Sequence, residues 1–425
     1  MSFSRLFIQP TQGKQKMKYM NKFTQFGLNA CGFLSLSIFS IGITMGHASA
    51  DTTSDDAFIE KSKLLERSSE ILFWTQEERA IGFKSISRMW PTRVVTKAKN
   101  AQPMVLNDIG LKNITYQVQG TKHTIEDFIA LKSAVGLVVL KDGELVYENY
   151  TEGNDKNTRW ISFSVTKSVS SLLIGTAVKD GYIASVNDQV VDYLPQLKGS
   201  AYDGVTIKNV LHMNSGVLWN EDYSDPNSDV SKAGGANGIT LINYVKALPR
   251  AHEPGTVFNY NTAESNLIGE LLRSAIGNNA ATYLQDKIWQ PYAMENDAFW
   301  VLDRPNGVET GGCCLLASLR DFARLGLFAY EQLSSPPSSP LPVNWIKDSI
   351  TPSTTYPNYG YQWWLETGSD KFRASGIFGQ SIAIYPELGV VIAKHGNTPK
   401  ATGPSVFKEH EKALDAAILA SIKDQ

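Results

Sequence analysis

Apolar and polar residues alternate along the chain in two kinds of block, which predict β-rich regions on either side of a helical middle. Residues 135–140 and 145–150 are apolar, β-branched runs separated by Lys141-Asp142-Gly143-Glu144. Asp-Gly between two such runs is typical of a β-hairpin. Similar short runs return near the C-terminus, separated by turn residues, at 359–365, 372–376, 381–385 and 390–393.

Helical spacing of apolar residues prevails between these regions. In residues 163–179 the apolar positions lie about one turn apart, and Asp180-Gly181 follows as a stop signal. Further helices are predicted at 57–72, 206–213, 263–276 and 408–422. The pattern predicts an α+β fold, in which one antiparallel sheet is flanked by helices and a helical lobe lies beside it. We expect an active site between sheet and lobe.

The first 50 residues have the pattern of a targeting segment. Four lysines precede an apolar run at 31–45, and Ala48-Ser49-Ala50 supplies the small residues of a cleavage site. The apolar run is too short and too rich in Ser and Gly to indicate a membrane span. We expect a signal peptide at 1–50, cleaved near Ala50, and a periplasmic or secreted chain with no membrane association afterwards. An uncleaved N-terminal anchor is the alternative.

The rest of the chain divides by pattern into an N-terminal extension, 51–125, that packs on a main domain, 126–425. With 425 residues, 42% hydrophobic and 19% charged, the composition is that of a soluble globular protein. The net charge of −2 gives no electrostatic footprint for nucleic acid. The composition does not determine the oligomeric state.

Cysteines and histidines do not form a metal-binding pattern, so we expect no metal site. Cys313 and Cys314 are adjacent, and adjacent cysteines rarely pair, so we expect two small residues near a turn. His252 and His395 allow a Ser-His-Asp triad as an alternative chemistry, but the chain contains no G-x-S-x-G elbow to carry its serine.

Ser164 and Lys167 form an S-x-x-K motif at the start of an apolar helical stretch. Residues three apart share one face of a helix, so the lysine can reach the serine hydroxyl and activate it. Ser405 and Lys408 have the same spacing, but they precede an ordinary surface helix, where a capping role for the serine suffices. We therefore take Ser164 as the candidate nucleophile.

A second motif, Tyr260-Asn261-Thr262, leads into the helix at 263–276. With Ser164 and Lys167 it resembles the class C β-lactamase-like serine hydrolases, which include D-alanyl peptidases, esterases and 6-aminohexanoate-dimer hydrolases. The last branch is the most similar. The strings that carry this similarity are S-F-S-V-T-K-S, F-N-Y-N-T-A-E-S-N-L-I-G and Gly311-Gly312-Cys313-Cys314.

The resemblance implies a role for each of these residues. Ser164 is the nucleophile, and Lys167 and Tyr260 share the base work, with the choice of acylation base left open. The N–H groups of Ser164 and Ile377 form the oxyanion hole. No cofactor is needed.

The strand 374–376 stands where the family has a K-T-G element, and two departures from the family pattern weaken the β-lactam interpretation. Ala374 replaces the usual Lys, His or Trp, and Thr262 replaces an asparagine. In the family, the groups that are replaced here help to bind the carboxylate and amide of a β-lactam, so we expect poor β-lactamase activity.

Substrate-binding candidates are Thr262, Tyr223, Ser375 and Gly376, with Trp363 and Trp364 alternating between core and pocket wall. The sequence thus predicts an exported serine hydrolase that acts on a small-molecule ester or amide. A D-alanyl-D-alanine peptidase or weak β-lactamase is one alternative. A non-catalytic sensor or binding protein of the same fold is the other.

Overall fold

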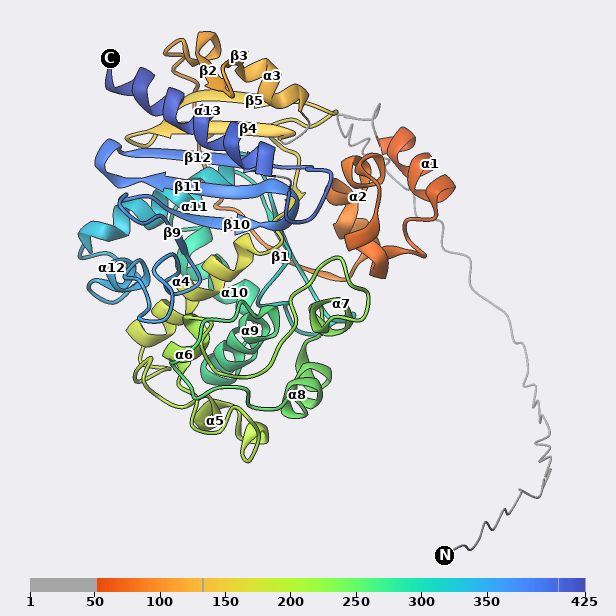
Figure 1. The fold of residues 1–425 in the computed structure, drawn as a ribbon, viewed down its shortest axis with the longest axis vertical. Helices are drawn as coiled ribbons and strands as arrows, with labels where there is room; N and C mark the ends of the chain where they lie inside the picture. The colour runs from red at the N-terminus through yellow and green to blue at the C-terminus, as the bar shows by residue number, and fades with distance from the viewer. Residues whose placement is uncertain (1–51, 132–133, 404, 425) are drawn as a thin grey trace, which may run out of the picture. The chain divides into compact units, whose positions relative to one another are not determined.

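A six-stranded antiparallel sheet organises the computed structural model, which describes residues 52–131, 134–403 and 405–424 (Figure 1). The N-terminal hairpin and the C-terminal strands lie in this one sheet, which confirms the prediction. In spatial order the strands are β5 (Glu144–Tyr150), β4 (Gly136–Lys141), β12 (Val390–His395), β11 (Gln380–Tyr385), β10 (Phe372–Gly376) and β9 (Trp364–Leu365).

The hairpin between β4 and β5 has the turn that its sequence predicts. Asp142 and Gly143 both have positive φ, 49° and 86°, as a two-residue type I′ turn requires. The register pairs Lys141 with Glu144 across this turn. The predicted strand at 359–365 is mostly wrong, because only Trp364–Leu365 pair with β10.

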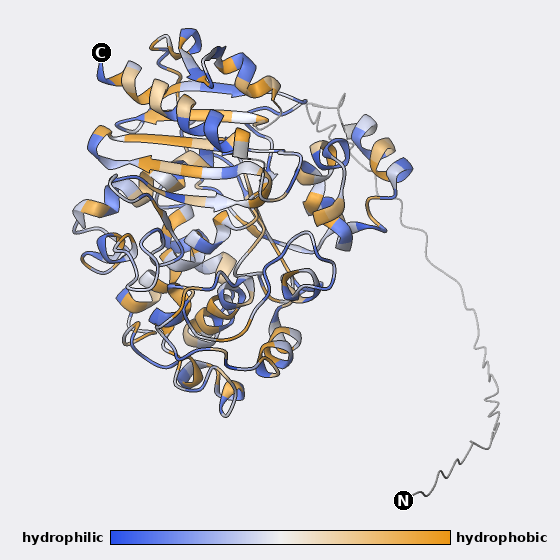
Figure 2. Cartoon of the chain, in the orientation of Figure 1, coloured by the Kyte–Doolittle hydropathy of each residue, from blue (hydrophilic) through white to orange (hydrophobic). Residues whose placement is uncertain are grey.

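Helices cover both faces of the sheet, with α13 (Ser405–Lys423) on one face and α11 (Leu319–Glu331) on the other (Figure 1). A Cβ on Gly326 of α11 would lie 2.6 Å from side-chain atoms of both Ile382 and Val391. Glycine therefore allows α11 to approach the sheet closely. Figure 2 shows the strands between these helices to be largely hydrophobic, as a sheet buried on both faces must be.

A helical lobe lies beside the sheet and is built around α4 (Val165–Lys179) and α9 (Thr262–Ile276). Most of α4 is buried, which explains its continuous apolar sequence. The other helices of the region are α5 (Val190–Tyr193), α6 (Ile207–Leu211), α7 (Asp229–Ala233), α8 (Gly238–Lys246), α10 (Ala280–Leu284) and α12 (Trp345–Ser349). The α+β fold with a helical lobe is thus confirmed.

A second antiparallel sheet was not anticipated from the sequence. Its order is β1 (Thr92–Val95), β7 (Ala298–Val301), β8 (Leu315–Ala317) and β6 (Trp160–Ile161). Strands of two to four residues leave little periodicity to detect. This sheet matters for the site because β6 ends three residues before Ser164.

Along the N-terminal segment the chain forms α1 (Thr52–Ser62), the 3₁₀ helix η1 (Ser68–Phe73), α2 (Gln76–Met89), strand β1 of the second sheet, the 3₁₀ helix η2 (Leu111–Asn113), β2 (Thr115–Val118) and β3 (Thr121–Thr124), and α3 (Ile125–Ala130) follows. The single helix predicted at 57–72 is wrong, because α1 ends at Ser62 and Lys63 has a φ of 55°. The predicted signal peptide lies outside the described residues. Among the residues that are described, no helix is both long and apolar enough to cross a bilayer.

Candidate active site

Ser164 stands at the start of α4, on a backbone that is bent just before it. Phe163 has a φ of 44°, a left-handed conformation that costs a non-glycine residue roughly 1–2 kcal/mol. The bend leaves Ser164 partly exposed, whereas the α4 residues immediately after it are buried. Its hydroxyl is not used to cap the helix. The structure therefore presents the hydroxyl at the surface of a cavity.

Lys167 lies one turn further along α4 and is only 1% exposed. Its Nζ donates to Thr262 Oγ1 at 3.2 Å and to the carbonyl oxygen of Gly312 at 2.9 Å. Burial lowers the pKa of Lys167 to about 8, although the nearby charge of Glu221 acts in the opposite direction. A substantial neutral fraction is therefore present at mildly alkaline pH.

Tyr260 comes from the loop that leads into α9, where the Asn261 side chain caps the helix by accepting from Glu264 N. Tyr260 and Ser164 line the same cavity. The Tyr260 ring lies 5.5 Å from Lys167 Nζ and stacks on Trp364 at 5.5 Å between centroids. Burial raises the pKa of Tyr260, so its hydroxyl is protonated near neutral pH.

Glu221 is a member of the site that the sequence argument missed. Its carboxylate accepts hydrogen bonds from Thr262 N at 3.0 Å and from the Tyr223 hydroxyl at 2.6 Å. The Thr262 hydroxyl and the Trp219 indole N–H also donate to it. Sequence analysis selected only Tyr223 from this loop, because the sequence does not show which of the neighbouring carboxylates, Glu221, Asp222 or Asp225, points into the site.

The end of β10 lies directly against the segment that precedes the nucleophile. A Cβ on Gly376 would lie 2.5 Å from the Ser162 carbonyl oxygen, so only glycine fits there. This close approach brings Ile377 next to Ser164, and both residues line the same two cavities. The proposed oxyanion pair, Ser164 and Ile377, thus lies together in the structure.

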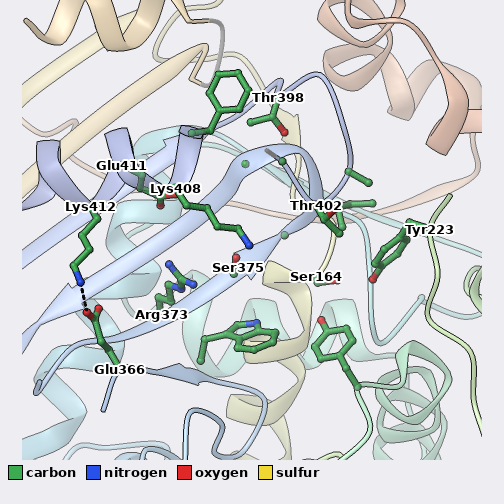
Figure 3. A pocket seen from close by; sticks show the side chains of 18 of the residues that line it. Ser164, Tyr223, Glu366, Arg373, Ser375, Thr398, Thr402, Lys408, Glu411 and Lys412 are labelled. Atoms are coloured by element: carbon green, nitrogen blue, oxygen red, sulfur yellow. Dashed lines mark ion pairs between the residues drawn. The ribbon is translucent and has the colours of Figure 1, made fainter. Parts of the chain in front are cut away.

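Two cavities meet at Ser164. The first, of about 510 Å³, is here called the cationic cavity, and its charged lining consists of Lys371, Arg373, Lys408, Lys412, Glu366 and Glu411. Ser375 and Trp364 also line it. Figure 3 shows Lys408 reaching from α13 across β10 toward Ser375, with Arg373 close by.

The second cavity, of about 550 Å³, is here called the apolar cavity, and its walls include Ile71, Leu72, Trp90, Val301, Leu302 and Cys313. Three of these residues belong to the N-terminal segment, so that segment supplies part of the site. Tyr223 and Ile377 line both cavities and mark the boundary between them.

The other residues singled out from the sequence lie partly in the cavity wall and partly in the core. Trp364 lines the cationic cavity, whereas Trp363 is core. Ala374 is also core, 1% exposed, so its methyl group adds nothing to the site. A disulfide joins Cys313 to Cys314, so the expectation that these neighbours stay unpaired is wrong.

The structure does not support a Ser-His-Asp triad. His395 is buried between Trp160 and Phe322, where desolvation lowers its pKa to about 3. His252 is exposed, and neither histidine lines the cationic or the apolar cavity.

Comparison with known proteins decides the family. Residues 122–417 match the Beta-lactamase family, which is more than half of the chain. The chain belongs to the Beta-lactamase family. It is 26% identical over 367 residues to the 6-aminohexanoate-dimer hydrolase of Paenarthrobacter ureafaciens, covering 80% of this chain and 89% of that one.

Solved structures show the same fold for this Beta-lactamase family member. A protein of Bacillus anthracis provisionally described as a 6-aminohexanoate-dimer hydrolase aligns with a TM-score of 0.70 at 18% identity, over 81% of this chain and 94% of that chain. The hydrolase EstCE1, described as having promiscuous acyltransferase activity, aligns with a TM-score of 0.55 at 16% identity, over 69% and 96%. The protein is thus a Beta-lactamase family member that is similar in sequence to a 6-aminohexanoate-dimer hydrolase and has the same fold as the hydrolase EstCE1.

Proposed function

We propose that this protein is a serine hydrolase that cleaves an ester or amide bond through an acyl-enzyme on Ser164. One observation carries the proposal. Ser164 lies where two cavities meet, Tyr260 lines one of these cavities with it, and Lys167 is buried beside the Tyr260 ring. A nucleophile, a proton relay and a base with a lowered pKa are the groups that serine acyl transfer needs.

In acylation, Ser164 Oγ attacks the substrate carbonyl carbon as its proton moves to Tyr260. Tyr260 passes its own phenolic proton to neutral Lys167, which has a pKa of about 8. The raised pKa of Tyr260 supports a relay and argues against a resting phenolate. The N–H groups of Ser164 and Ile377 hold the oxyanion, where one such donor typically contributes about 10²–10³ in rate.

The proton then returns along the same path to the leaving amine or alcohol, and the carbon–nitrogen or carbon–oxygen bond breaks. In deacylation, water attacks the ester carbonyl and gives its proton to the Tyr260–Lys167 pair. That proton finally restores the Ser164 hydroxyl. Every step uses side chains and backbone N–H groups of this chain, together with water.

The two cavities support a substrate with two unlike ends. The apolar cavity suits a hydrocarbon chain. In the cationic cavity, Lys371 is paired with Asp415 and Glu366, at 3.4 and 3.6 Å. Within the described residues, neither Arg373 nor Lys408 has a carboxylate at ion-pair distance, so both are available to a substrate anion. A linear amide of the 6-aminohexanoate type, with a methylene chain and a free carboxylate, meets both requirements.

A D-alanyl-D-alanine peptidase is a second candidate, because a peptide's free carboxylate would also suit Arg373 and Lys408. β-Lactams lack one group that the family pattern provides for them, because the buried Ala374 stands where the family has a Lys, His or Trp, although Arg373 on the same strand leaves a cation for their carboxylate. A purely binding or sensing role has no need of Ser164, Lys167 and Tyr260 together.

Export is part of the proposal and rests on the pattern of residues 1–50. We expect the protein in the periplasm or the medium, with its N-terminus near Asp51. N-terminal sequencing of the protein from each cell fraction tests this. A full-length cytoplasmic product would contradict it.

A panel of four substrates tests the activity: p-nitrophenyl butyrate, the linear 6-aminohexanoate dimer, a D-Ala-D-Ala peptide and nitrocefin, each with Ser164→Ala as control. We expect the ester and the linear amide to be hydrolysed much faster than nitrocefin. If nitrocefin is the best substrate, the interpretation of Ala374 is wrong. If the D-Ala-D-Ala peptide is the best substrate, the protein is a D-alanyl-D-alanine peptidase and not an esterase or linear-amide hydrolase.

A further inference from the structure

Helix α2 of the N-terminal segment contacts the residues that flank both predicted oxyanion donors. Phe163 precedes Ser164, and Phe378 follows Ile377. Phe83 of α2 packs its ring against both, at 5.0 Å from the Phe163 ring and 5.5 Å from the Phe378 ring. The Phe163 and Phe378 rings lie 5.6 Å from each other, so the three rings form a closed cluster.

Both flanking residues have an unfavourable backbone. Phe163 has a φ of 44° and Phe378 a φ of 61°. Such conformations persist in non-glycine residues only where the surroundings hold them. Here the shared surrounding group is Phe83, which is 0% exposed. The cluster therefore packs against both bends, one directly before Ser164 and the other directly after Ile377.

Arg79, one turn before Phe83 on α2, holds the same region from a second direction. Its guanidinium lies 4.4 Å from the centre of the Phe378 ring. It also donates to Asn397 Oδ1 at 3.1 Å and to the Thr398 carbonyl at 2.9 Å. Arg79 is thus joined to the loop at 397–401.

That loop binds the backbone of Phe378 on both sides. Phe378 N donates to the Ala401 carbonyl at 2.8 Å, and Thr398 N donates to the Phe378 carbonyl at 3.0 Å. A continuous path of contacts leads from Arg79 through this loop to the peptide next to Ile377.

Burying the charged guanidinium group of Arg79 has a desolvation cost that a purely structural residue would avoid. Arg79 is 2% exposed, and in the described part of the chain no carboxylate lies at ion-pair distance from it. Burying a cation that is matched only by neutral oxygens is unfavourable unless its geometry serves another purpose.

We propose that Phe83 and Arg79 are positioning residues that hold the oxyanion hole of Ser164 and Ile377 in its productive geometry, which makes α2 a part of the active site. This rests on the proposed function, since it assumes that Ser164 forms a tetrahedral intermediate. Neither residue touches the substrate. Both act through Phe163 and Phe378.

The test compares Phe83→Leu and Arg79→Met with Ile86→Val, a matched control that is equally buried on the same helix. Leucine is chosen at position 83 because it keeps an apolar side chain, so Phe83→Leu disturbs folding less than Phe83→Ala. For each folded protein, kcat and KM are measured with p-nitrophenyl butyrate, and Ki with a phenylboronic acid. The boronic acid forms a tetrahedral adduct on the serine and so reports on the oxyanion hole.

We expect kcat to fall about tenfold or more and Ki to rise by a similar factor in Phe83→Leu and Arg79→Met, while KM changes less than about twofold. Ile86→Val should keep wild-type kcat and Ki. Folded variants with lower melting temperature but unchanged kcat and Ki would overturn the proposal, because their role would be stability alone. That result leaves the proposed function standing. A wild-type protein with neither turnover nor adduct would overturn both.

Discussion

The ammonium group of Lys167 and the carboxylate of Glu221 are joined through one hydroxyl group, that of Thr262. Lys167 Nζ donates to Thr262 Oγ1 at 3.2 Å, and the same hydroxyl donates to Glu221. This arrangement gives the third residue of the Tyr260-Asn261-Thr262 motif a task. The threonine holds the lysine in place and lets a carboxylate influence its pKa without a direct ion pair.

Replacing Glu221 should therefore damage the site in a specific way. In Glu221→Gln one acceptor oxygen is lost and an N–H₂ group faces donors from Thr262 and Tyr223. We expect kcat/KM to fall about tenfold or more, since leaving such partners unmatched costs roughly 1–3 kcal/mol. The charge of Glu221 raises the pKa of Lys167, so its removal should move the acid limb of the pH–rate profile to lower pH.

Asp222→Asn is the matched control, because Asp222 is exposed and its carboxylate accepts from Ser224, two residues further along the same loop. Its activity should stay within about twofold of wild type. Equal losses in the two variants would show that loop folding, and not the Glu221 carboxylate, is responsible.

The pH dependence of activity should report the titration of Lys167. With a pKa of about 8, Lys167 is mostly protonated at pH 6 and mostly neutral at pH 9. If neutral Lys167 is the base, kcat/KM for an uncharged ester falls about tenfold per pH unit below 8. A profile that is flat from pH 6 to 9 would rule out this role.

Glu264 is a second group whose titration would produce an acid limb at the same pH, since burial raises its pKa to about 8. The variant Glu264→Gln removes this second titration. The acid limb should remain in the variant if Lys167 causes it. Its disappearance would assign the limb to Glu264.

Glu264 should instead affect stability. Its folded pKa of about 8 lies above the ordinary 4.5, so the folded protein binds more protons between these values. Stability therefore falls as pH rises through this window, by up to about 1.4 kcal/mol per unit for this one group. Urea unfolding at several pH values should show a smaller decline in Glu264→Gln than in wild type. Identical declines would mean that Glu264 is ionised in the folded protein.

The fold follows from the sequence wherever residues are buried in regular patterns. The β4–β5 hairpin was predictable because a single pair, Asp142-Gly143, accepts the positive φ values of its turn. Helix α4 was predictable because its apolar spacing extends over four turns. The second sheet was not, because β6 has only two residues and depends on β8, which lies about 150 residues away in the chain.

In the candidate site too, some residues are recognisable from local motifs and others are not. Ser164, Lys167 and Tyr260 stand in motifs and were found from them. Glu221, Arg79 and Phe83 act through contacts between segments distant in sequence, so no spacing marks them.

Arg373 should discriminate between substrates by charge. In Arg373→Gln we expect KM to rise about 5–10-fold for an ester with a free carboxylate, and to stay within about twofold for its neutral methyl ester. Lys412→Gln is the control, because Lys412 is paired with Glu366 at 3.8 Å and 81% exposed. Equal effects of Arg373→Gln on both substrates would exclude a role in anion recognition.

The central claim is the acyl-enzyme on Ser164, and intact-mass analysis after reaction with a fluorophosphonate tests it most directly. One adduct per chain is expected in wild type, mapped to the peptide that contains Ser164. It should be absent from Ser164→Ala and present in Ser405→Ala, which removes the serine of the other S-x-x-K string. An adduct that persists in Ser164→Ala, or no adduct in wild type, would contradict the account.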